Sequence, residues 1–233
     1  MKRDSVRRYA RQIILPEVGV DGQQRLMAAR VLIVGLGGLG SPIAQYLAAA
    51  GVGTLGLSEF DVLELHNLQR QTLYGTSGVG AAKLTLALER LREVNPELIY
   101  VPHDRLEPSN AAATLERYDL VIDATDNFAA RYLIADTCAM LGKTCVWGAA
   151  VGWEGMASVF DAQMTLRDLF PEPPSEQEDC DTLGVHGPLL GVIGSVMASQ
   201  AIKHLLGLPT LRGKLWLFDA LNGTVRCPAI SRA

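Results

Sequence analysis

The sequence predicts an α/β fold in which a doubly wound, mainly parallel sheet is extended by antiparallel strands toward the C-terminus. Between residues 31 and 160, short apolar segments alternate with longer segments of helical periodicity, a pattern typical of parallel strands connected by helices. Asn222 and Gly223 separate two later apolar segments, and this dipeptide is a strong signal for a hairpin. The 233 residues, 48% of them hydrophobic, are enough for one domain with its own core.

The first strand and the turn after it are the most informative part of the chain. Residues 31–34 are apolar and mostly β-branched, as expected for a strand that is buried on both faces. Gly35, Gly37 and Gly40 follow in the spacing G-x-G-x-x-G, which permits a tight turn, close approach of a phosphate and close helix packing, respectively. We therefore expect a Rossmann-like fold with an anion site at the start of the next helix.

The helix after this loop has recognisable ends. Ser41 is expected to cap it, Pro42 to occupy its first position and Gly51 to end it. The further strands are expected at residues 54–58, 98–101, 120–122, 144–149, 156–160, 214–219 and 224–230, and helices at 79–94 and 128–141. This pattern predicts one domain (1–233), comprising an N-terminal arm (1–30), a nucleotide-binding core (31–152) and a C-terminal part (153–233) with a crossover loop, a buried helix and the hairpin.

Two segments of the C-terminal part have an unusual composition. Residues 170–183 are polar, acidic and proline-containing, so we expect a mobile loop. Residues 182–202 carry no charge over 21 positions, which is nominally enough to span a bilayer. Their glycines and serines favour a buried helix that another helix approaches closely, and no membrane association is expected.

Charge and cysteine content disfavour several classes of protein. Lys and Arg number 21 against 25 Asp and Glu, for a net charge of −4, and no long basic run is present, so nucleic acid is an unlikely partner. The charged N-terminus is followed by no apolar signal core, so we expect a cytoplasmic protein. The four cysteines, at positions 138, 145, 180 and 227, form no C-x-x-C pair, so neither a disulfide framework nor a zinc site is expected.

Polar residues gather where the second strand is expected to end. Glu59 occupies the place where an acidic residue of this fold accepts hydrogen bonds from ribose hydroxyls, and Asp61 is its competitor. Glu59 can instead be an exposed acid in a loop at the end of the strand. Residues 66–71 form a polar cluster at the same edge, in which Arg70 offers planar donors for phosphate oxygens.

A lysine and two aspartates complete this edge. Lys83 lies near the start of a predicted helix, where a cation is disfavoured unless an anion binds beside it; a solvated lysine is the alternative. Asp123 and Asp126 follow the strand at 120–122, and a carboxylate there suits Mg²⁺, which binds one or two protein oxygens together with phosphates and water. Asp126 can also act as a helix cap.

Several of these motifs together resemble one known family. Residues 8–12 (Arg-Tyr-Ala-Arg-Gln), the glycine loop, residues 67–71, Lys83, residues 123–127 and residues 187–194 occur in this order along nearly the whole chain. The combination resembles the ThiF/MoeB/HesA family of ubiquitin-activating-like enzymes, which adenylylate sulfur-carrier proteins in cofactor biosynthesis. It is far more specific than the glycine loop alone.

The resemblance implies a reaction and a set of site residues. The C-terminal glycine carboxylate of a small ubiquitin-like carrier, which ends in Gly-Gly, attacks the α-phosphorus of ATP, giving an acyl-adenylate and pyrophosphate. The implied roles place Gly38 and its neighbours on the nucleotide, Glu59 on the ribose, Asn67, Arg70 and Lys83 on the phosphates, Asp126 on Mg²⁺ with Asn127 beside it, and Arg11 in the active site of the other subunit of a homodimer.

Two departures from the family pattern matter. Family members commonly hold a structural zinc with two C-x-x-C pairs, but here the first pair is replaced by residues 165–168 (Thr-Leu-Arg-Asp) and the second is absent.

Cys180 matches a loop cysteine that joins covalently to the carrier in some relatives. Its flanking acids are Glu176, Glu178, Asp179 and Asp181. Their negative charge raises a thiol pKa and lowers the thiolate fraction, so an unreactive exposed thiol is the alternative.

Three other functions remain open from the sequence. A nicotinamide-dependent oxidoreductase shares the glycine loop, but it does not need the cations Arg70 and Lys83. A binding module that retains ATP without catalysis would not need the full set of charged residues. A relative that activates a small molecule or a tRNA base is the third alternative, and the low basic content disfavours tRNA.

Overall fold

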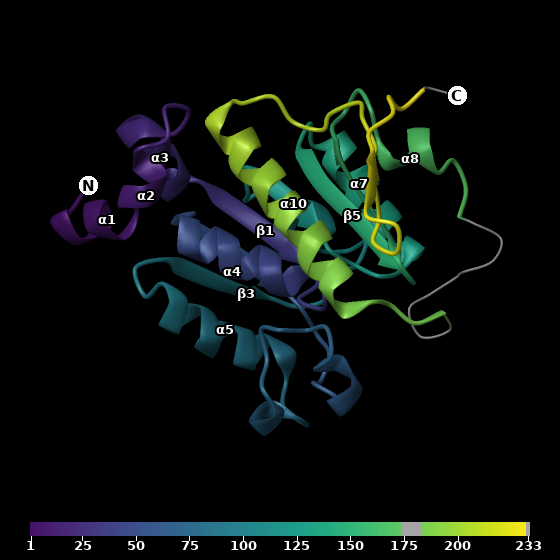
Figure 1. Ribbon diagram of the computed structural model, residues 1–233, viewed down its shortest axis with the longest axis horizontal. Coiled ribbons are helices and arrows are strands. Elements are labelled where there is room, and N and C mark those ends of the chain that lie inside the picture. Colours follow the sequence, from purple (N-terminus) through teal and green to yellow (C-terminus); the bar gives the residue numbers. More distant parts are fainter. Residues whose placement is uncertain (174–182, 232–233) are drawn as a thin grey trace.

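Eight strands form one sheet in the order β3-β2-β1-β4-β5-β6-β7-β8 (Figure 1). The computed structural model describes residues 1–173 and 183–231. The strands are β1 (Arg30–Val34), β2 (Thr54–Ser58), β3 (Ile99–His103), β4 (Leu120–Asp123), β5 (Thr144–Val151), β6 (Glu154–Phe160), β7 (Trp216–Asp219) and β8 (Thr224–Arg226). The first five run parallel, and β6, β7 and β8 extend the sheet antiparallel from β5. The predicted fold class is confirmed.

Helices cover both faces of the sheet. In chain order they are α1 (Arg3–Arg8), α2 (Ala10–Ile13), α3 (Gly19–Ala28), α4 (Gly40–Ala50), α5 (Lys83–Val94), α6 (Ala111–Leu115), α7 (Phe128–Met140), α8 (Leu166–Leu169) and α10 (Gly187–Leu206), with 3₁₀ turns at Leu65–Asn67 and Thr76–Gly78. Successive side chains of a strand point to opposite faces. Val31 and Ile33 accordingly share a core with α4, α5 and α10, whereas Leu32 and Val34 pack with α6 and α7.

Helix α10 is long and apolar enough to cross a membrane, but half of its most apolar stretch is buried inside the protein. Leu189, Ile193 and Met197 are fully or almost fully buried against the sheet and α4. A Cβ at Gly194 would lie 2.5 Å from Pro42 Cγ, so the small residue lets α4 and α10 approach closely. The placement agrees with the predicted core helix, and in Figure 1 α10 crosses the front of the sheet beside α4.

Two predicted helix starts are wrong. Helix α4 begins at Gly40, and Ser41 does not cap it; its hydroxyl donates to the Gly37 carbonyl oxygen at 2.7 Å because the glycine loop already turns the chain before residue 41. Pro42 is accordingly the third residue of the helix. Helix α5 begins at Lys83 and not at residue 79, because residues 81–83 pair with the backbone of residues 61–63.

The remaining boundaries agree more closely with the sequence pattern. Gly51 ends α4 with a φ of 82°, and the predicted hairpin forms around Asn222 and Gly223, although β8 ends at Arg226 and not at residue 230. Most of the predicted mobile loop lies at residues 174–182, outside the described residues.

The N-terminal arm packs at the end of α4 that is remote from the glycine loop. The Tyr9 ring lies against Gly51, and its hydroxyl accepts a hydrogen bond from Asn95 Nδ2 at 2.8 Å. Gln12 Nε2 donates to the Ala50 carbonyl oxygen at 3.1 Å. An 11-residue helix is roughly 16 Å long at 1.5 Å per residue, and this length separates the arm from the phosphate loop (Figure 1).

Candidate active site

A cavity of about 610 Å³ opens at the carboxyl ends of β1, β2 and β4. The sheet order places β2 and β4 on either side of β1, so the cavity lies where the direction of winding reverses, which is the usual ligand site of this architecture. The residues predicted from the sequence that line it are Gly35, Gly37, Glu59, Asp61, Lys83, Asp126 and Asn127. They come from four separate segments of the chain.

The glycines of the loop serve different purposes. Gly35 has a φ of 88°, and a Cβ there would lie 2.7 Å from the Ala124 carbonyl oxygen. A Cβ at Gly40 would lie 2.0 Å from the Gly35 carbonyl oxygen, and one at Gly38 would lie 2.6 Å from Leu190 Cδ1. Gly35 and Gly40 are therefore needed by the protein's own packing, because their contacts are with backbone, whereas the contact at Gly38 is with a side-chain methyl group. A Cβ at Gly37 meets only the Gln71 amide, at 3.6 Å, so this position leaves space for a ligand.

Glu59 connects the second strand to the glycine loop. Its Oε2 accepts from the Leu36 amide at 2.9 Å, and its Oε1 accepts from the Phe60 and Asp61 amides at 2.8 and 2.9 Å. The residue is only 7% exposed. A carboxylate has about four acceptor sites, so one site remains for a ribose hydroxyl after these three backbone contacts.

Lys83 and Asp61 form an ion pair on the cavity wall. The Lys83 ammonium lies 3.0 Å from Asp61 Oδ2, and the side chains are 5% and 51% exposed, respectively. Tyr74 donates from its hydroxyl to the Leu36 carbonyl oxygen at 2.9 Å. Burial raises the Tyr74 pKa well above its usual value, and the nearby carboxylates of Glu59 and Asp61 raise it further. The phenol therefore stays protonated and fixes the loop.

Three polar residues at the end of β4 and just after it have different roles. Asn127 is the cap of α7, since its Oδ1 accepts from the Ala130 amide at 2.9 Å. Asp126 is therefore not the cap, and its exposed carboxylate faces the cavity. Asp123 is buried, and burial raises its pKa; its Oδ1 accepts from the Thr125 hydroxyl at 2.7 Å. Of these residues, Asp126 is the one available to a metal ion.

Other predicted residues lie apart from the cavity. Asn67 is buried and its Oδ1 accepts from the Glu64 amide at 3.0 Å, which fixes a 3₁₀ turn. Arg70 donates to the His66 carbonyl oxygen at 3.3 Å, and neither residue lines the cavity. Arg11 is exposed on α2, at the remote end of α4. Cys180 lies outside the described residues.

The cavity also contains residues that were not singled out from the sequence. Gln71 lines it beside Gly37, and only its membership of the polar cluster at 66–71 pointed to it. The Arg105 guanidinium lies over the Phe60 ring, 4.5 Å from the centroid, and both residues line the cavity. Leu106 and Leu133 supply apolar wall. The segment 105–109 carries no motif that could have identified it.

The region where relatives have zinc-binding cysteines is held by other contacts. Residues 165–168 contain a capping box at the start of α8, and Arg167 makes two hydrogen bonds to the Asp136 carboxylate, at 2.8 and 2.7 Å. Ile230 packs in the same apolar cluster as Leu166 and Trp147. Among the described residues, no group of three or more His, Cys, Asp or Glu side chains is placed to hold a metal ion.

We expect the protein to be stable without zinc. Prolonged treatment with EDTA should leave the melting temperature unchanged, because burial around Ile230 and the Arg167–Asp136 pair join these segments instead of a metal. Differential scanning fluorimetry before and after chelation measures this, and elemental analysis of untagged protein measures the zinc content. One zinc per chain, or a clear drop in melting temperature, would contradict the prediction.

Comparisons with known proteins identify the family of this chain. The model of the ThiF family matches residues 9–233. The chain is 45% identical over 242 residues to a probable adenylyltransferase/sulfurtransferase MoeZ of Mycobacterium tuberculosis, covering all of this chain and 62% of MoeZ. It is 44% identical over 241 residues to the sulfur carrier protein adenylyltransferase of Thermus thermophilus, covering 99% of this chain and 89% of that protein. It spans 52% of the bovine adenylyltransferase and sulfurtransferase MOCS3.

The solved structure of E. coli MccB with MccA-N7isoASN has the same fold, with a TM-score of 0.84, 18% identity, and coverage of 98% of this chain and 73% of that one. The chain thus spans just over half to nine-tenths of the lengths of these curated relatives. A family match over almost the whole sequence and more than 40% identity to several relatives confirm the resemblance stated from the motifs. The chain belongs to the ThiF family.

Proposed function

We propose that this protein is an ATP-dependent adenylyltransferase that activates the C-terminal glycine of a small ubiquitin-like sulfur-carrier protein. The observation that carries the proposal is the meeting of an open glycine position, Glu59, Lys83 and Asp126 on one cavity. The names of the relatives in Thermus and Mycobacterium support the same reaction. The carrier supplies sulfur to a cofactor or metabolite, and the reaction takes place in the cytoplasm.

The proposed chemistry is a single displacement at phosphorus. A carboxylate oxygen of the carrier's terminal glycine bonds to the α-phosphorus of ATP, and the bond from that phosphorus to the bridging oxygen of pyrophosphate breaks. Negative charge on the phosphoryl oxygens is stabilised by the Lys83 ammonium and by the glycine loop that leads into α4. Glu59 holds the ribose through its remaining acceptor site.

The site fits a magnesium ion that enters with the nucleotide. The exposed carboxylate of Asp126 faces the cavity, and Mg²⁺ in nucleotide sites commonly uses one or two carboxylates together with phosphate oxygens and water. The ion neutralises phosphate charge when bound. Asp126 is available for this role because Asn127 already caps α7.

Asp126→Asn should raise the Mg²⁺ concentration needed for half-maximal activity by roughly tenfold or more, because the anionic ligand is lost. Folding should be preserved, since the cap of α7 is unchanged. A magnesium titration of pyrophosphate release measures the effect, with Asp21→Asn on the exposed face of α3 as the matched control. An unaltered magnesium requirement in Asp126→Asn would show that this carboxylate is not a ligand.

Carrier-dependent release of pyrophosphate tests the function itself. The protein should release pyrophosphate when incubated with ATP, Mg²⁺ and a carrier ending in Gly-Gly, and not with the same carrier lacking its last two residues. Mass spectrometry should then find the carrier increased by the mass of an adenylyl group. Release that needs no carrier, or tight binding of a nicotinamide dinucleotide in place of ATP, would contradict the proposal.

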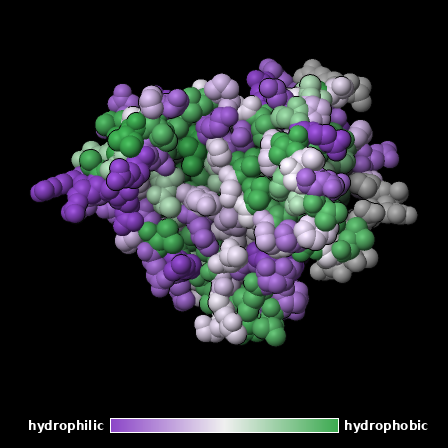
Figure 2. All heavy atoms as spheres, viewed as in Figure 1, coloured by the Kyte–Doolittle hydropathy of each residue, from purple (hydrophilic) through white to green (hydrophobic). Residues whose placement is uncertain are grey.

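We further propose that the active enzyme is a homodimer in which Arg11 completes the site of the other subunit. Arg11 lies at the end of α4 remote from its own cavity, so within one chain it does not reach the phosphates. A shallow groove runs between α4 and α10 and is lined by Pro42, Tyr46, Val192 and Val196. Figure 2 shows this face, where pale and green residues gather along the middle of the molecule.

Mixing two inactive variants tests this arrangement. Arg11→Ala and Lys83→Ala should each lose activity, and their mixture should recover roughly a quarter of wild-type activity, because half of randomly exchanged dimers are mixed and each has one intact site. The control is each variant alone, assayed at the total protein concentration of the mixture. Native mass spectrometry of tagged subunits establishes that exchange occurs; exchange without recovery would mean that Arg11 does not act across the interface.

A further inference from the structure

The Gln71 side chain is an unexplained polar group inside the cavity. It is only 5% exposed, and its Oε1 has no hydrogen-bond partner among the described residues. Both backbone polar groups of Gln71 are hydrogen-bonded. Its backbone N–H donates to the Asn67 carbonyl oxygen, and its backbone carbonyl oxygen accepts from the Tyr74 backbone N–H. A buried acceptor without a donor is unfavourable and rare in native proteins, so this oxygen points to a ligand that donates a hydrogen bond.

The triphosphate of ATP cannot be that donor. Phosphate oxygens only accept hydrogen bonds, so they can be bound by Gln71 Nε2, which lies 3.6 Å from a Cβ built at Gly37, but they cannot satisfy Oε1. The ribose hydroxyls have an acceptor in Glu59. The apolar wall suited to a nucleobase, which includes Leu106 and Leu133, comes from the 105–109 segment and α7. The ribose and the nucleobase thus have places in the cavity other than Gln71.

The position of Gln71 favours the carrier, the second substrate of the proposed reaction, as the hydrogen-bond donor to Oε1. The turn at residues 67–71 lies between the glycine loop and the start of α10: a Cβ at Gly187 would be 2.5 Å from the Gln69 carbonyl oxygen, and one at Gly38 would be 3.5 Å from Arg70 Cγ. Gln71 therefore borders the phosphate loop on the side of α10, across the sheet from α7, which supplies part of the apolar wall. A peptide ending in glycine presents a backbone N–H two bonds from its carboxyl carbon.

We propose that Gln71 binds the terminal peptide group of the carrier, with Oε1 accepting from the N–H of the last glycine and Nε2 facing the phosphate that this glycine attacks. The inference rests on the proposed function and adds a residue that determines specificity. It explains how the site selects a glycine at the end of a polypeptide over a free carboxylic acid, which offers the same nucleophile without the amide N–H.

Gln71→Met is the first test, because methionine is of similar size and has neither an amide oxygen nor an amide nitrogen. We expect kcat/KM for the carrier to fall roughly 10- to 100-fold, while the Kd for ATP changes by less than about threefold. The melting temperature of the free variant should not fall, since an unsatisfied buried acceptor is removed. Gln24→Met, at an exposed glutamine of α3, is the matched control.

A carrier with an altered backbone isolates the hydrogen bond itself. Semisynthesis can replace the terminal glycine by glycolic acid, so that an ester oxygen stands where the N–H was. The wild-type enzyme should lose activity on this carrier by a factor similar to the Gln71→Met effect, and Gln71→Met should lose little more on it, because both changes remove the same contact.

The outcomes separate this inference from the proposed function. Full additivity of the two changes, or weaker ATP binding with normal use of the carrier, would overturn the assignment of Gln71 while leaving the adenylyltransferase intact. An unchanged kcat/KM in Gln71→Met would do the same. Absence of carrier-dependent pyrophosphate release by the wild-type protein would overturn both.

Discussion

Lys83→Met is expected to reduce carrier-dependent pyrophosphate release by roughly 100- to 1000-fold, the loss typical of removing one preorganised group that stabilises transition-state charge. The ammonium is buried at the first residue of α5 and is held 3.0 Å from Asp61. An ion at that position is already oriented and largely dry, so it interacts strongly with phosphoryl oxygens. Stopped-flow or coupled assays of pyrophosphate release at saturating ATP measure kcat directly.

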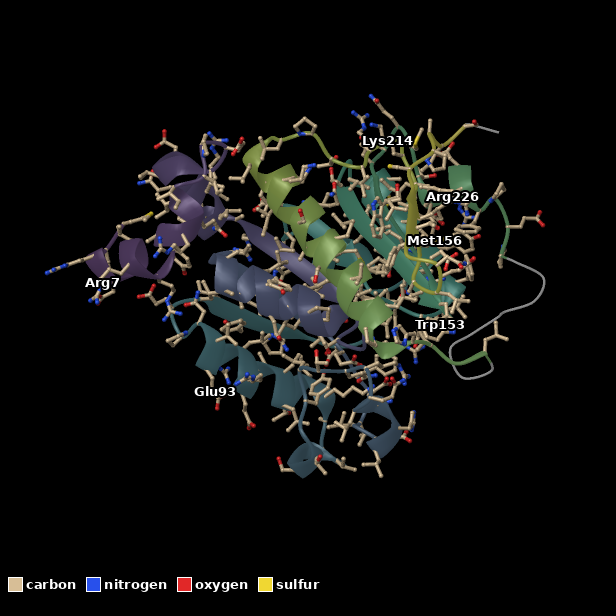
Figure 3. All side chains as sticks on the ribbon, viewed as in Figure 1. Arg7, Glu93, Trp153, Met156, Lys214 and Arg226 are labelled. Carbon is tan, nitrogen blue, oxygen red and sulfur yellow. The ribbon has the colours of Figure 1, made fainter. Side chains whose placement is uncertain are left out.

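The fold should survive this substitution. Methionine fills the volume of the lysine stem, and Asp61 remains 51% exposed, so its carboxylate is hydrated when its partner is removed. The melting temperature of Lys83→Met should therefore stay close to that of the wild type. Lys214→Met is the control: Lys214 is exposed beside β7 and is labelled at the outer part of the sheet in Figure 3. Near-normal kcat in Lys83→Met would remove this cation from the proposed mechanism.

Gly40→Ala is expected to lower the stability of the protein, and Gly37→Ala is expected to lower its affinity for ATP. A Cβ at Gly40 would lie 2.0 Å from the Gly35 carbonyl oxygen, a contact with backbone that a rotamer change cannot relieve. We expect a loss of about 3 kcal/mol in the free energy of unfolding, which corresponds to roughly 6–12 °C in melting temperature for a chain of this size. The apolar contacts of α4 with the sheet should keep the remaining protein folded.

Gly37→Ala should instead leave the free protein intact. Its Cβ would meet only the Gln71 amide, at the ordinary contact distance of 3.6 Å, and Gly37 does not have a positive φ. The added methyl group occupies the space beside the backbone where a phosphate approaches, so ATP affinity should fall about tenfold or more. Calorimetric titration with ATP and thermal unfolding, done on both variants, separate the two predictions. Equal destabilisation by both substitutions would contradict this division of roles.

The sequence by itself determined the sheet and most of its strands. Residues 31–34 and 120–122 are uninterrupted apolar runs that are buried in β1 and β4, and the central strands of a parallel sheet are buried on both faces in this way. The spacing of Gly35, Gly37 and Gly40 fixed the position of the phosphate loop, because Gly35 has a positive φ and a Cβ at Gly40 would meet the Gly35 carbonyl oxygen. These requirements are local, so they can be read from neighbouring residues.

Only the tertiary structure decided which polar residues of the cluster at 66–71 face the cavity. Sequence reasoning selected Asn67 and Arg70, but the turn directs Asn67 to the Glu64 amide and brings Gln71 to the cavity wall. The start of α5 at Lys83 was likewise decided by pairing with residues 61–63, more than 15 positions earlier in the chain. The direction of a turn side chain depends on contacts with distant segments, and such contacts leave no periodic pattern in the sequence.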